Sequence, residues 1–445
     1  MPPQISPQLR AASRQSGGSS SPLGAGFNVV NTMIGSGILA LPYALKEAGF
    51  YFGILVLILV AFLTLFSLNT LVYSGRRVGL YKYEDVSAAA LGRSGYFLLS
   101  FALSVNSIGS CISYLIIVGD VVTAIAQTAF GVSVFTTRQA VIVVAAVGFT
   151  LPLLFFRTLE PLVKPSALSI FCLPVIVSIV AIRGPTYALP EPAPTPVFGP
   201  SILPAFGVIA FAYSCTQTCF QNYQTLQSKT LTAWRRATSY ATATSALIYL
   251  AFSVISYKSF GVGTQPNLLN NFSNDDALAN IARVLLAFTL TLTYPMQFYP
   301  VRDLLGEFLG LPVETLTRSQ KPLFHALTLT MFAGTLATAL AITDLGFVFK
   351  LIGTAASSLL VFGLPGVVYL RLVSPYLWSK PCQGTLASET SALLQLADPG
   401  HVDSDGDVDS ISEPCTSVVS ALLLLLGFGV FVIGTWTSIH EFVSS

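Results

Sequence analysis

A short polar interruption lies inside an apolar run near the start of the chain. Gly35, Ser36 and Gly37 separate apolar residues 27–34 from a second apolar run that starts at Ile38. Because glycine lowers helix stability, we expect a helix break here. In a membrane, a break leaves main-chain N–H and C=O groups without partners, which is costly unless protein, water or a ligand binds them. The sequence therefore predicts a binding site at this break.

The groups freed by such a break suit a zwitterion with a carboxylate and an ammonium group. Main-chain N–H groups near Ser36 and Gly37 would begin the continuing half-helix and attract the carboxylate. Carbonyls from Met33 to Gly35 would end the preceding half-helix and attract the ammonium or a metal cation. We therefore predict ligand contacts at Met33, Gly35, Ser36 and Gly37.

A second interruption lies in the other half of the chain. The polar run Ser214–Thr218 falls inside the sixth apolar segment, about 180 residues after Gly35. Interrupted helices at corresponding positions of two five-helix halves indicate an inverted-repeat transporter with its site at the membrane midplane. A second interpretation stays open, since the pair Gly35 and Gly37 would also let neighbouring helices pack closely.

Neighbouring helices supply further candidates. We expect the pocket for the variable part of the ligand to be lined by Phe211, Ser214 and Cys215 from the sixth helix and by Asn106 and Ser110 from the third.

Hydroxyl groups in the eighth apolar segment suit a small, hard cation. Thr291 and Thr293 precede Pro295, which frees a main-chain carbonyl. The alternative is that these hydroxyls bond within their own helix. Asp120, near the outer end of the third helix, is either a proton carrier or a residue wetted by the outer solvent.

Composition indicates a polytopic membrane protein. Of 445 residues, 53% are hydrophobic and 9% are charged, with a mean hydropathy of +0.72, whereas soluble domains carry about 25% charged residues. The net charge of +2 is scattered and excludes a nucleic-acid partner, and the six cysteines show no metal or disulfide spacing. Segments of about 20 apolar residues predict eleven spans: Phe27–Leu45, Tyr51–Tyr73, Tyr96–Thr123, Gln139–Phe156, Ser166–Ile182, Ile202–Tyr223, Tyr240–Phe260, Ala277–Tyr299, Leu323–Ile342, Val348–Leu370 and Val418–His440.

The distribution of charge predicts the orientation. With the N-terminus in the cytosol, about 16 Lys and Arg residues lie on the cytosolic side and about six on the other. The predicted regions are a disordered cytosolic tail (1–25), a first five-helix repeat (26–183), an outer proline-rich connector (184–201), a second five-helix repeat (202–372), a disordered acidic cytosolic loop (373–417), and an eleventh helix with an outer or lumenal C-terminus (418–445).

The run from Asn31 to Pro42, NTMIGSGILALP, resembles the first-helix motif of the amino acid/auxin permease family. That family includes sodium-coupled neutral amino acid transporters and fungal vacuolar amino acid transporters. Further matches lie at Val118–Asp120, Phe206–Phe211, Thr230–Arg236 and Tyr294–Arg302.

The resemblance implies an all-α LeuT-type fold of eleven helices, with broken first and sixth helices, that moves amino acids by alternating access. It places Asn31, and Thr291 or Thr293, where sodium-coupled relatives bind the ion. Relatives often have a histidine after the cysteine of the sixth helix, but here Thr216 follows Cys215. Since threonine does not titrate near neutral pH, a coupling scheme that uses a titrating imidazole at this position fails for this chain. Both Na⁺ and H⁺ remain open as the coupling ion.

The expected function is secondary active transport of amino acids, small and neutral ones because no Lys or Arg faces the predicted pocket. The alternative is a membrane sensor that binds amino acids without net transport. We expect no enzyme activity, no cofactor and no metal beyond a sodium site. We expect a monomer in the lipid bilayer of the vacuole or the plasma membrane.

Overall fold

The computed structural model describes residues 18, 20–133, 136–156, 160–188, 194–311, 320–374 and 413–444, without the side chains of 160–170 and 413–415. Most of the predicted cytosolic tail and of the predicted acidic loop, and part of the proline-rich connector, lie outside the described residues.

The described chain is helical. The first half contains α2 (Pro22–Met33), η1 (Ser36–Ala40), α3 (Leu41–Ala48), α4 (Phe50–Val78), α5 (Tyr83–Leu91), α6 (Arg93–Phe130), α7 (Arg138–Ala145), α8 (Leu151–Leu154) and α9 (Glu160–Arg183). The second half contains α10 (Ile202–Ala212), η5 (Thr216–Thr218), α11 (Cys219–Gln224), α12 (Leu231–Phe260), α13 (Ala277–Phe308), α14 (Lys321–Ala341), α15 (Leu345–Ile352), α16 (Leu364–Leu372), α18 (Glu413–Gly429) and α19 (Thr435–Ser444).

Each of the eleven predicted spans corresponds to a helical segment. Among the described residues, eight helices are long and apolar enough to cross a membrane, and α2 with η1 and α3 forms a further span bent by 52°. The remaining two predicted spans correspond to shorter apolar helices in the described part, 138–154 and 171–187. The second of these comprises the end of the 24-residue α9 and the 3₁₀ turn that follows it. The prediction of an all-α polytopic membrane protein is therefore confirmed.

The first helix begins at Pro22, earlier than the predicted Phe27. Ser21 caps it, and proline at the first helical position is favoured because that residue needs no N–H partner. Just before the cap, the N–H of Ser20 donates to the carbonyl of Thr225 at 2.9 Å. The start of the first helix is thereby joined to the chain that follows the sixth.

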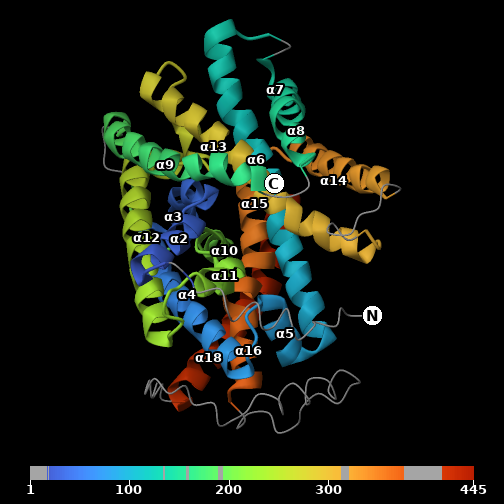
Figure 1. The fold of residues 1–445 in the computed structure, drawn as a ribbon. Helices are drawn as coiled ribbons and strands as arrows, with labels where there is room; N and C mark the ends of the chain where they lie inside the picture. The colour runs from blue at the N-terminus through green and yellow to red at the C-terminus, as the bar shows by residue number, and fades with distance from the viewer. Residues whose placement is uncertain are drawn as a thin grey trace.

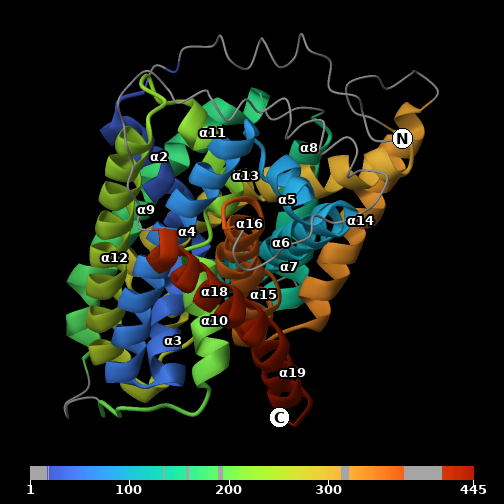
Figure 2. The ribbon, with the colours of Figure 1, turned by 90° about the horizontal axis from the view of Figure 1, so that it is seen from below.

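The two interrupted helices lie in the middle of the bundle. Figures 1 and 2 show α2, α3, α10 and α11 enclosed by the longer helices, with α12 on one side and α15 on another. α2 packs against α11 and α12, whereas α3 packs against α10 and α4. The first and sixth helices therefore run in opposite directions, as an inverted repeat requires.

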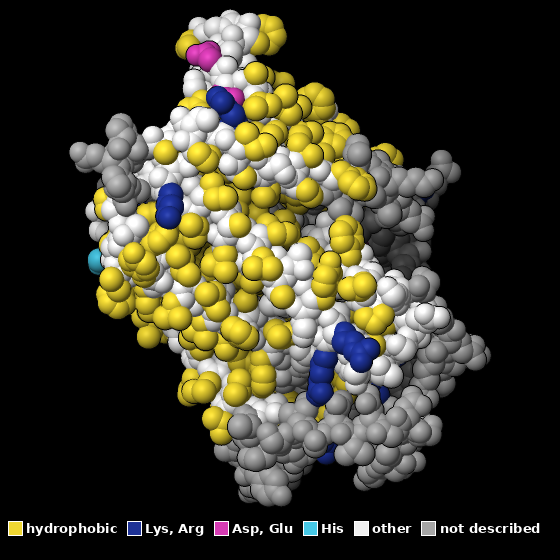
Figure 3. All heavy atoms as spheres, turned by 90° about the vertical axis from the view of Figure 1, so that its left-hand side faces the viewer, with side chains coloured by type: hydrophobic (Ala, Val, Ile, Leu, Met, Phe, Trp, Pro, Cys, Tyr) yellow, Lys and Arg dark blue, Asp and Glu magenta, His cyan; other side chains and the backbone are white. Residues whose placement is uncertain are grey.

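The outer surface of the bundle is apolar. Figure 3 shows one face covered by hydrophobic side chains, with Lys and Arg in small groups near its margins. Large exposed side chains such as Leu55, Phe62 and Leu247 belong to the membrane-spanning helices. Since a water-facing surface rarely carries so large an apolar area, this surface faces lipid.

Candidate functional site

The first helix breaks where the sequence predicts. α2 ends at Met33, and the chain resumes as the 3₁₀ turn η1 at Ser36. Between them Ile34 has φ −78° and ψ 78°, and Gly35 is extended with φ −112° and ψ −152°. The N–H of Gly35 donates to the carbonyl of Met33 at 2.8 Å. A helix that ends and restarts in this way leaves main-chain groups available inside the bundle.

The two glycines of this break have different surroundings. A Cβ added to Gly35 would meet no heavy atom within 4 Å, so Gly35 faces open space. A Cβ added to Gly37 would lie 2.8 Å from the Cα of Ala212, which is too close for any side chain. The two glycines therefore differ: Gly35 lies in the break and faces open space, and Gly37 lets two helices pack closely. That Gly35 contacts a ligand stays a prediction.

The sixth helix also breaks at the predicted polar run. α10 ends at Ala212, and a short 3₁₀ turn from Thr216 leads into α11 at Cys219. Tyr213 and Cys215 between them leave the helical conformation, with ψ values of 6° and 2°. This break contains no glycine and no residue with positive φ.

Donors and acceptors face each other across the breaks. Within the described part of the chain, the N–H groups of Ser36 and Gly37 have no recorded acceptor. Ser36 and Met33 are buried, and Gly35 is half-buried. The start of η1 therefore offers N–H groups to an anion, while the ends of α2 and α10 offer carbonyls to a cation.

A tyrosine from α6 contacts the first break. The hydroxyl of Tyr114 lies near the side chain of Ser36 and near those of Thr293 and Gln297 on α13. Tyr114 thereby brings together one predicted ligand residue and one predicted ion residue. Sequence reasoning missed Tyr114, although it follows the predicted Ser110 by one helical turn.

The other predicted residues of α6 bond elsewhere. The side-chain oxygen of Asn106 accepts a hydrogen bond from the hydroxyl of Ser357 at 3.2 Å. Ser110 donates to the carbonyl of Asn106 at 2.8 Å, one turn earlier in its own helix. Neither side chain has a recorded contact with the first break, so their place in the ligand pocket stays a prediction.

The predicted residues of the sixth helix lie at its break. The ring of Phe211 packs 5.7 Å from the ring of Phe349, centroid to centroid, and is half-buried. Cys215 is buried, and the hydroxyl of Ser214 lies 3.5 Å from the side-chain oxygen of Gln217. These positions agree with a pocket wall beside the first break.

The predicted ion-coupling residues do not form a closed cage. Thr291 donates to the carbonyl of Ala287 at 2.7 Å, and Thr293 to that of Thr289 at 2.9 Å. A threonine bonded in this way keeps oxygen lone pairs for a cation. Asn31 is exposed on α2. An ion site at these three residues stays a prediction.

An ion cluster holds α3, the half of the first helix that follows the break. Lys350 on α15 lies 2.6 Å from a carboxylate oxygen of Glu47 on α3 and 3.0 Å from one of Glu441 on α19. Ser201 also donates to Glu441 at 2.7 Å. The sequence did not indicate this cluster, because its three charges come from distant parts of the chain. A second pair, Asp120 with Arg138 at 2.7 Å, shows that Asp120 is ion-paired.

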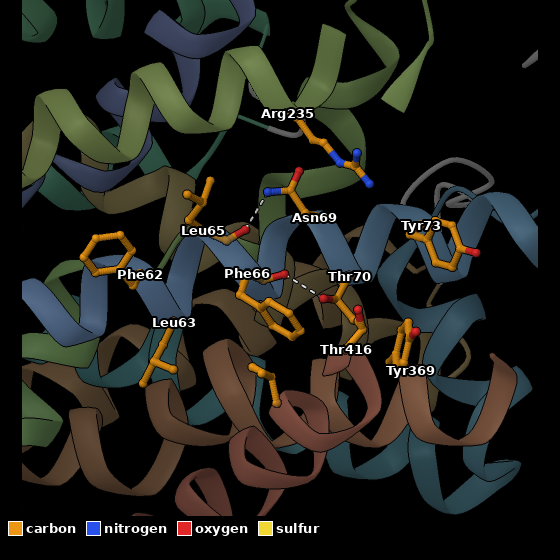
Figure 4. Close-up of a pocket in the computed structure, with 11 residues that line it drawn as sticks. Phe62, Leu63, Leu65, Phe66, Asn69, Thr70, Tyr73, Arg235, Tyr369 and Thr416 are labelled. Carbon is orange, nitrogen blue, oxygen red and sulfur yellow. Dashed lines mark hydrogen bonds between the residues drawn. The ribbon is translucent and has the colours of Figure 1, made fainter. Parts of the chain in front are cut away.

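A separate cavity of about 460 Å³ lies between α4, α16 and α18. Figure 4 shows Phe62 and Leu63 at one end and Arg235 and Tyr73 toward the other. None of the predicted site residues lines this cavity. The candidate site at the helix breaks is therefore separate from this cavity.

Comparisons with known proteins agree with this architecture. The sequence profile described as "Transmembrane amino acid transporter protein" matches residues 18–383. The chain is 36% identical to "Putative sodium-coupled neutral amino acid transporter 11" of Rattus norvegicus, over 80% of this chain and 79% of that protein. It is 26% identical to "Vacuolar amino acid transporter 2" of Saccharomyces cerevisiae, over 78% and 76% of the two chains.

A solved structure of a Na⁺-coupled sialic acid symporter in a substrate-bound outward-open state overlaps 96% of this chain and 93% of its own. The sequence identity is 12% and the TM-score is 0.48, so no conclusion rests on this likeness. The family profile and the relatives cover most of the chain, and the protein belongs to the transmembrane amino acid transporter family.

Proposed function

We propose that the protein is a secondary active transporter that carries small neutral amino acids by alternating access. The observation that carries this proposal is the meeting of two broken helices inside the bundle. α2 and α10 end there from opposite directions, and the N–H groups of Ser36 and Gly37 begin the next segment beside them. Free N–H groups beside the carbonyl ends of two half-helices, all in a buried place, complement a zwitterion.

The substrate binds in the orientation that the helix ends dictate. Its carboxylate accepts hydrogen bonds from the N–H groups of Ser36 and Gly37, and its ammonium group donates to carbonyls at the ends of α2 and α10. The substrate side chain lies toward Phe211, Ser214 and Cys215.

A neutral substrate agrees with the placement of the buried cations. Arg283 donates to the carbonyls of Leu269 and Phe272, in the connection between α12 and α13. Arg302 lies against Tyr299 and Phe324 at the other end of α13. Lys350 is paired with two carboxylates. Within the described residues, these cations serve contacts outside the breaks, so nothing there balances a second substrate carboxylate.

A cation gradient drives the transport. Support for Na⁺ comes from the name of the rat relative and from the hydroxyl oxygen of Thr293 near the first break, which suits a hard cation. A proton-driven cycle would have to use another group than the residue after Cys215, because Thr216 does not titrate. The membrane is that of the vacuole or the plasma membrane, with the N-terminus in the cytosol and the C-terminus on the lumenal or extracellular side.

The proposal is tested by uptake of labelled amino acids into proteoliposomes. We expect uptake of small neutral amino acids under an imposed Na⁺ or H⁺ gradient and none without a gradient. Uptake that is indifferent to both gradients would contradict secondary active transport. Amino acid binding without any flux would instead identify a sensor.

Gly35→Val tests the location of the site. Gly35 has an extended backbone that valine adopts readily, and its neighbourhood is open, so the variant should fold and fill the substrate space. We expect uptake to be lost with an unchanged unfolding temperature. Gly148→Val is the matched control, because Gly148 also faces open space but lies on the outer surface, between α7 and α8. Equal uptake by both variants would place the site elsewhere.

A further inference from the structure

One side chain touches the ends of both half-helices. Tyr249 on α12 is completely buried. Its hydroxyl oxygen lies 2.6 Å from the carbonyl oxygen of Met33 and 2.8 Å from that of Ala212. Met33 is the last residue of α2, and Ala212 is the last residue of α10. A single hydroxyl therefore caps the first and the sixth helix at their breaks.

This arrangement needs a proton donor. The last carbonyls of a helix lack partners within the helix and carry the negative end of its dipole. Two such ends that meet away from water repel each other, and the repulsion is strong because the surroundings screen it poorly. The proton of Tyr249 lies between the two carbonyls and offsets this repulsion. Without this hydroxyl, the carbonyls of Met33 and Ala212 would stay buried next to each other and would lose the hydrogen-bond donor that they share.

The surrounding contacts make the two ends one unit. The ring of Tyr213, the residue after Ala212, packs edge-on against the ring of Tyr249 at 4.9 Å between centroids. The missing side chain of Gly37 lets η1 approach Ala212. Met33 and Ala212 are therefore held by Tyr249, and η1 is held against the same Ala212.

We propose that Tyr249 is a positioning residue that keeps the carbonyl ends of α2 and α10 in register. This inference rests on the proposed transport function. Tyr249 need not touch the substrate, since it acts by fixing the two helix ends beside which the substrate and the coupling cation bind. Its hydroxyl determines how well the two helix ends are aligned, and hence the apparent affinity for the amino acid and for the cation.

The test compares Tyr249→Phe with Tyr257→Phe. Both tyrosines lie on α12, and each hydroxyl bonds to main-chain carbonyls, but Tyr257 donates to Pro194 at 2.9 Å, away from the breaks. Unfolding temperature, KM for the amino acid, maximal uptake rate and the cation concentration for half-maximal uptake are measured for each. We expect Tyr249→Phe to raise KM by about tenfold, the equivalent of one hydrogen bond, and to shift the cation dependence. Tyr257→Phe should leave both unchanged.

The inference is overturned if Tyr249→Phe lowers only the unfolding temperature, or only the maximal rate through loss of folded protein, while KM and cation dependence match the wild type. If Tyr249→Phe does not fold, 3-fluorotyrosine at position 249 serves instead, because it keeps the shape and strengthens the donor. It should then lower KM, with no effect at position 257. An unchanged KM at 249 contradicts the inference.

The two proposals fail in different ways. Absence of gradient-driven uptake by the wild-type protein refutes the proposed transport. The role of Tyr249 is then decided by binding alone, measured as the rise in unfolding temperature that an amino acid produces. A rise that Tyr249→Phe reduces and Tyr257→Phe does not supports the inference, and no difference between them refutes it.

Discussion

Both breaks interrupt a membrane helix, but they are built from different residues. The first contains Gly35 and Gly37, whereas the second, from Tyr213 to Cys215, contains no glycine. Neither uses a positive φ, and the described glycines that do, such as Gly79 and Gly92, lie at helix ends elsewhere. A break inside a membrane therefore does not depend on unusual backbone angles. It depends on what receives the freed main-chain groups.

The breaks also differ in how they are anchored. Past the first break, α3 is held by charge, through Glu47 and Lys350. Past the second, the hydroxyl of the buried Thr216 donates to the carbonyl of Leu360 at 3.0 Å, which is a neutral hydrogen bond. The first break keeps open space at Gly35. We propose that the first break supplies the adaptable side of the candidate site and that the second supplies a fixed wall.

The largest effect is expected from loss of the charged anchor. Lys350→Met leaves the carboxylate of Glu47 buried without a partner, and removal of one member of a buried pair costs about 3–5 kcal/mol. We expect a matching loss in unfolding free energy in detergent. Glu47→Gln in the same chain should restore most of it, because the only charge then left in the cluster is that of Glu441, which is partly exposed and keeps its hydrogen bond from Ser201. A double variant no more stable than Lys350→Met would show that charge is not what anchors α3.

A smaller effect is expected from the packed glycine. Gly37→Ala places a methyl group against the Cα of Ala212, and overpacking of this kind costs about 1–3 kcal/mol. We expect a lower unfolding temperature and a loss of uptake. Gly35→Ala is the control and should leave the unfolding temperature unchanged. If both alanines destabilise equally, the contrast between the two glycines is wrong.

Loss of the neutral hydrogen bond of Thr216 should lower the unfolding free energy by less than either change above. Thr216→Val keeps the volume but removes the hydrogen bond to Leu360, which is worth about 0.5–1.5 kcal/mol. We expect a modest loss of stability with KM for the amino acid unchanged, as measured by unfolding and by uptake. A KM change as large as that of Tyr249→Phe would show that the second break is not a fixed wall.

An ion pair that touches neither break serves as a control for the effects of the two anchors. Asp276 caps α13, and its carboxylate lies 2.7 Å from Arg183. Burial alone would raise the pKa of Asp276, but the hydrogen bonds from Arg183, the N–H of Ala279 and Tyr187 outweigh it and hold the pKa below 3.8. Because the folded-state pKa is lowered, this stabilisation is complete above about pH 4 and is lost as the pH falls through the lowered pKa.

Asp276→Asn should therefore lower the unfolding temperature at neutral pH, and the difference from the wild type should shrink below about pH 4. KM should be unchanged. An altered KM would mean that charge anchors far from the breaks also shape the site.

The sequence predicted the parts of the site that depend on local chemistry. Glycine and serine in an apolar run marked the first break, and Ser214–Thr218 marked the second. The earlier helix start was also readable, since Ser21 followed by Pro22 is a standard cap. Such features need only neighbouring residues.

The contacts between helices could not be predicted in this way. Tyr249 is 216 residues from Met33, and Lys350 is 303 residues from Glu47. A tyrosine in an apolar run is typical of ordinary packing, so nothing local marks Tyr249 as a cap. The sequence also shows that Thr291 carries a hydroxyl but not where it points, and the structure shows that it donates to its own helix.

The contact of Glu441 with Lys350 has a practical consequence for the design of expression vectors. The eleventh helix lies outside the two predicted repeats, yet Glu441 in its last turn forms an ion pair with the buried Lys350. A truncation before Glu441, or a rigid reporter fused directly behind it, would disturb the half of the first helix that leads away from the break. Affinity handles and fluorescent reporters therefore belong on the other terminus, or behind a flexible spacer.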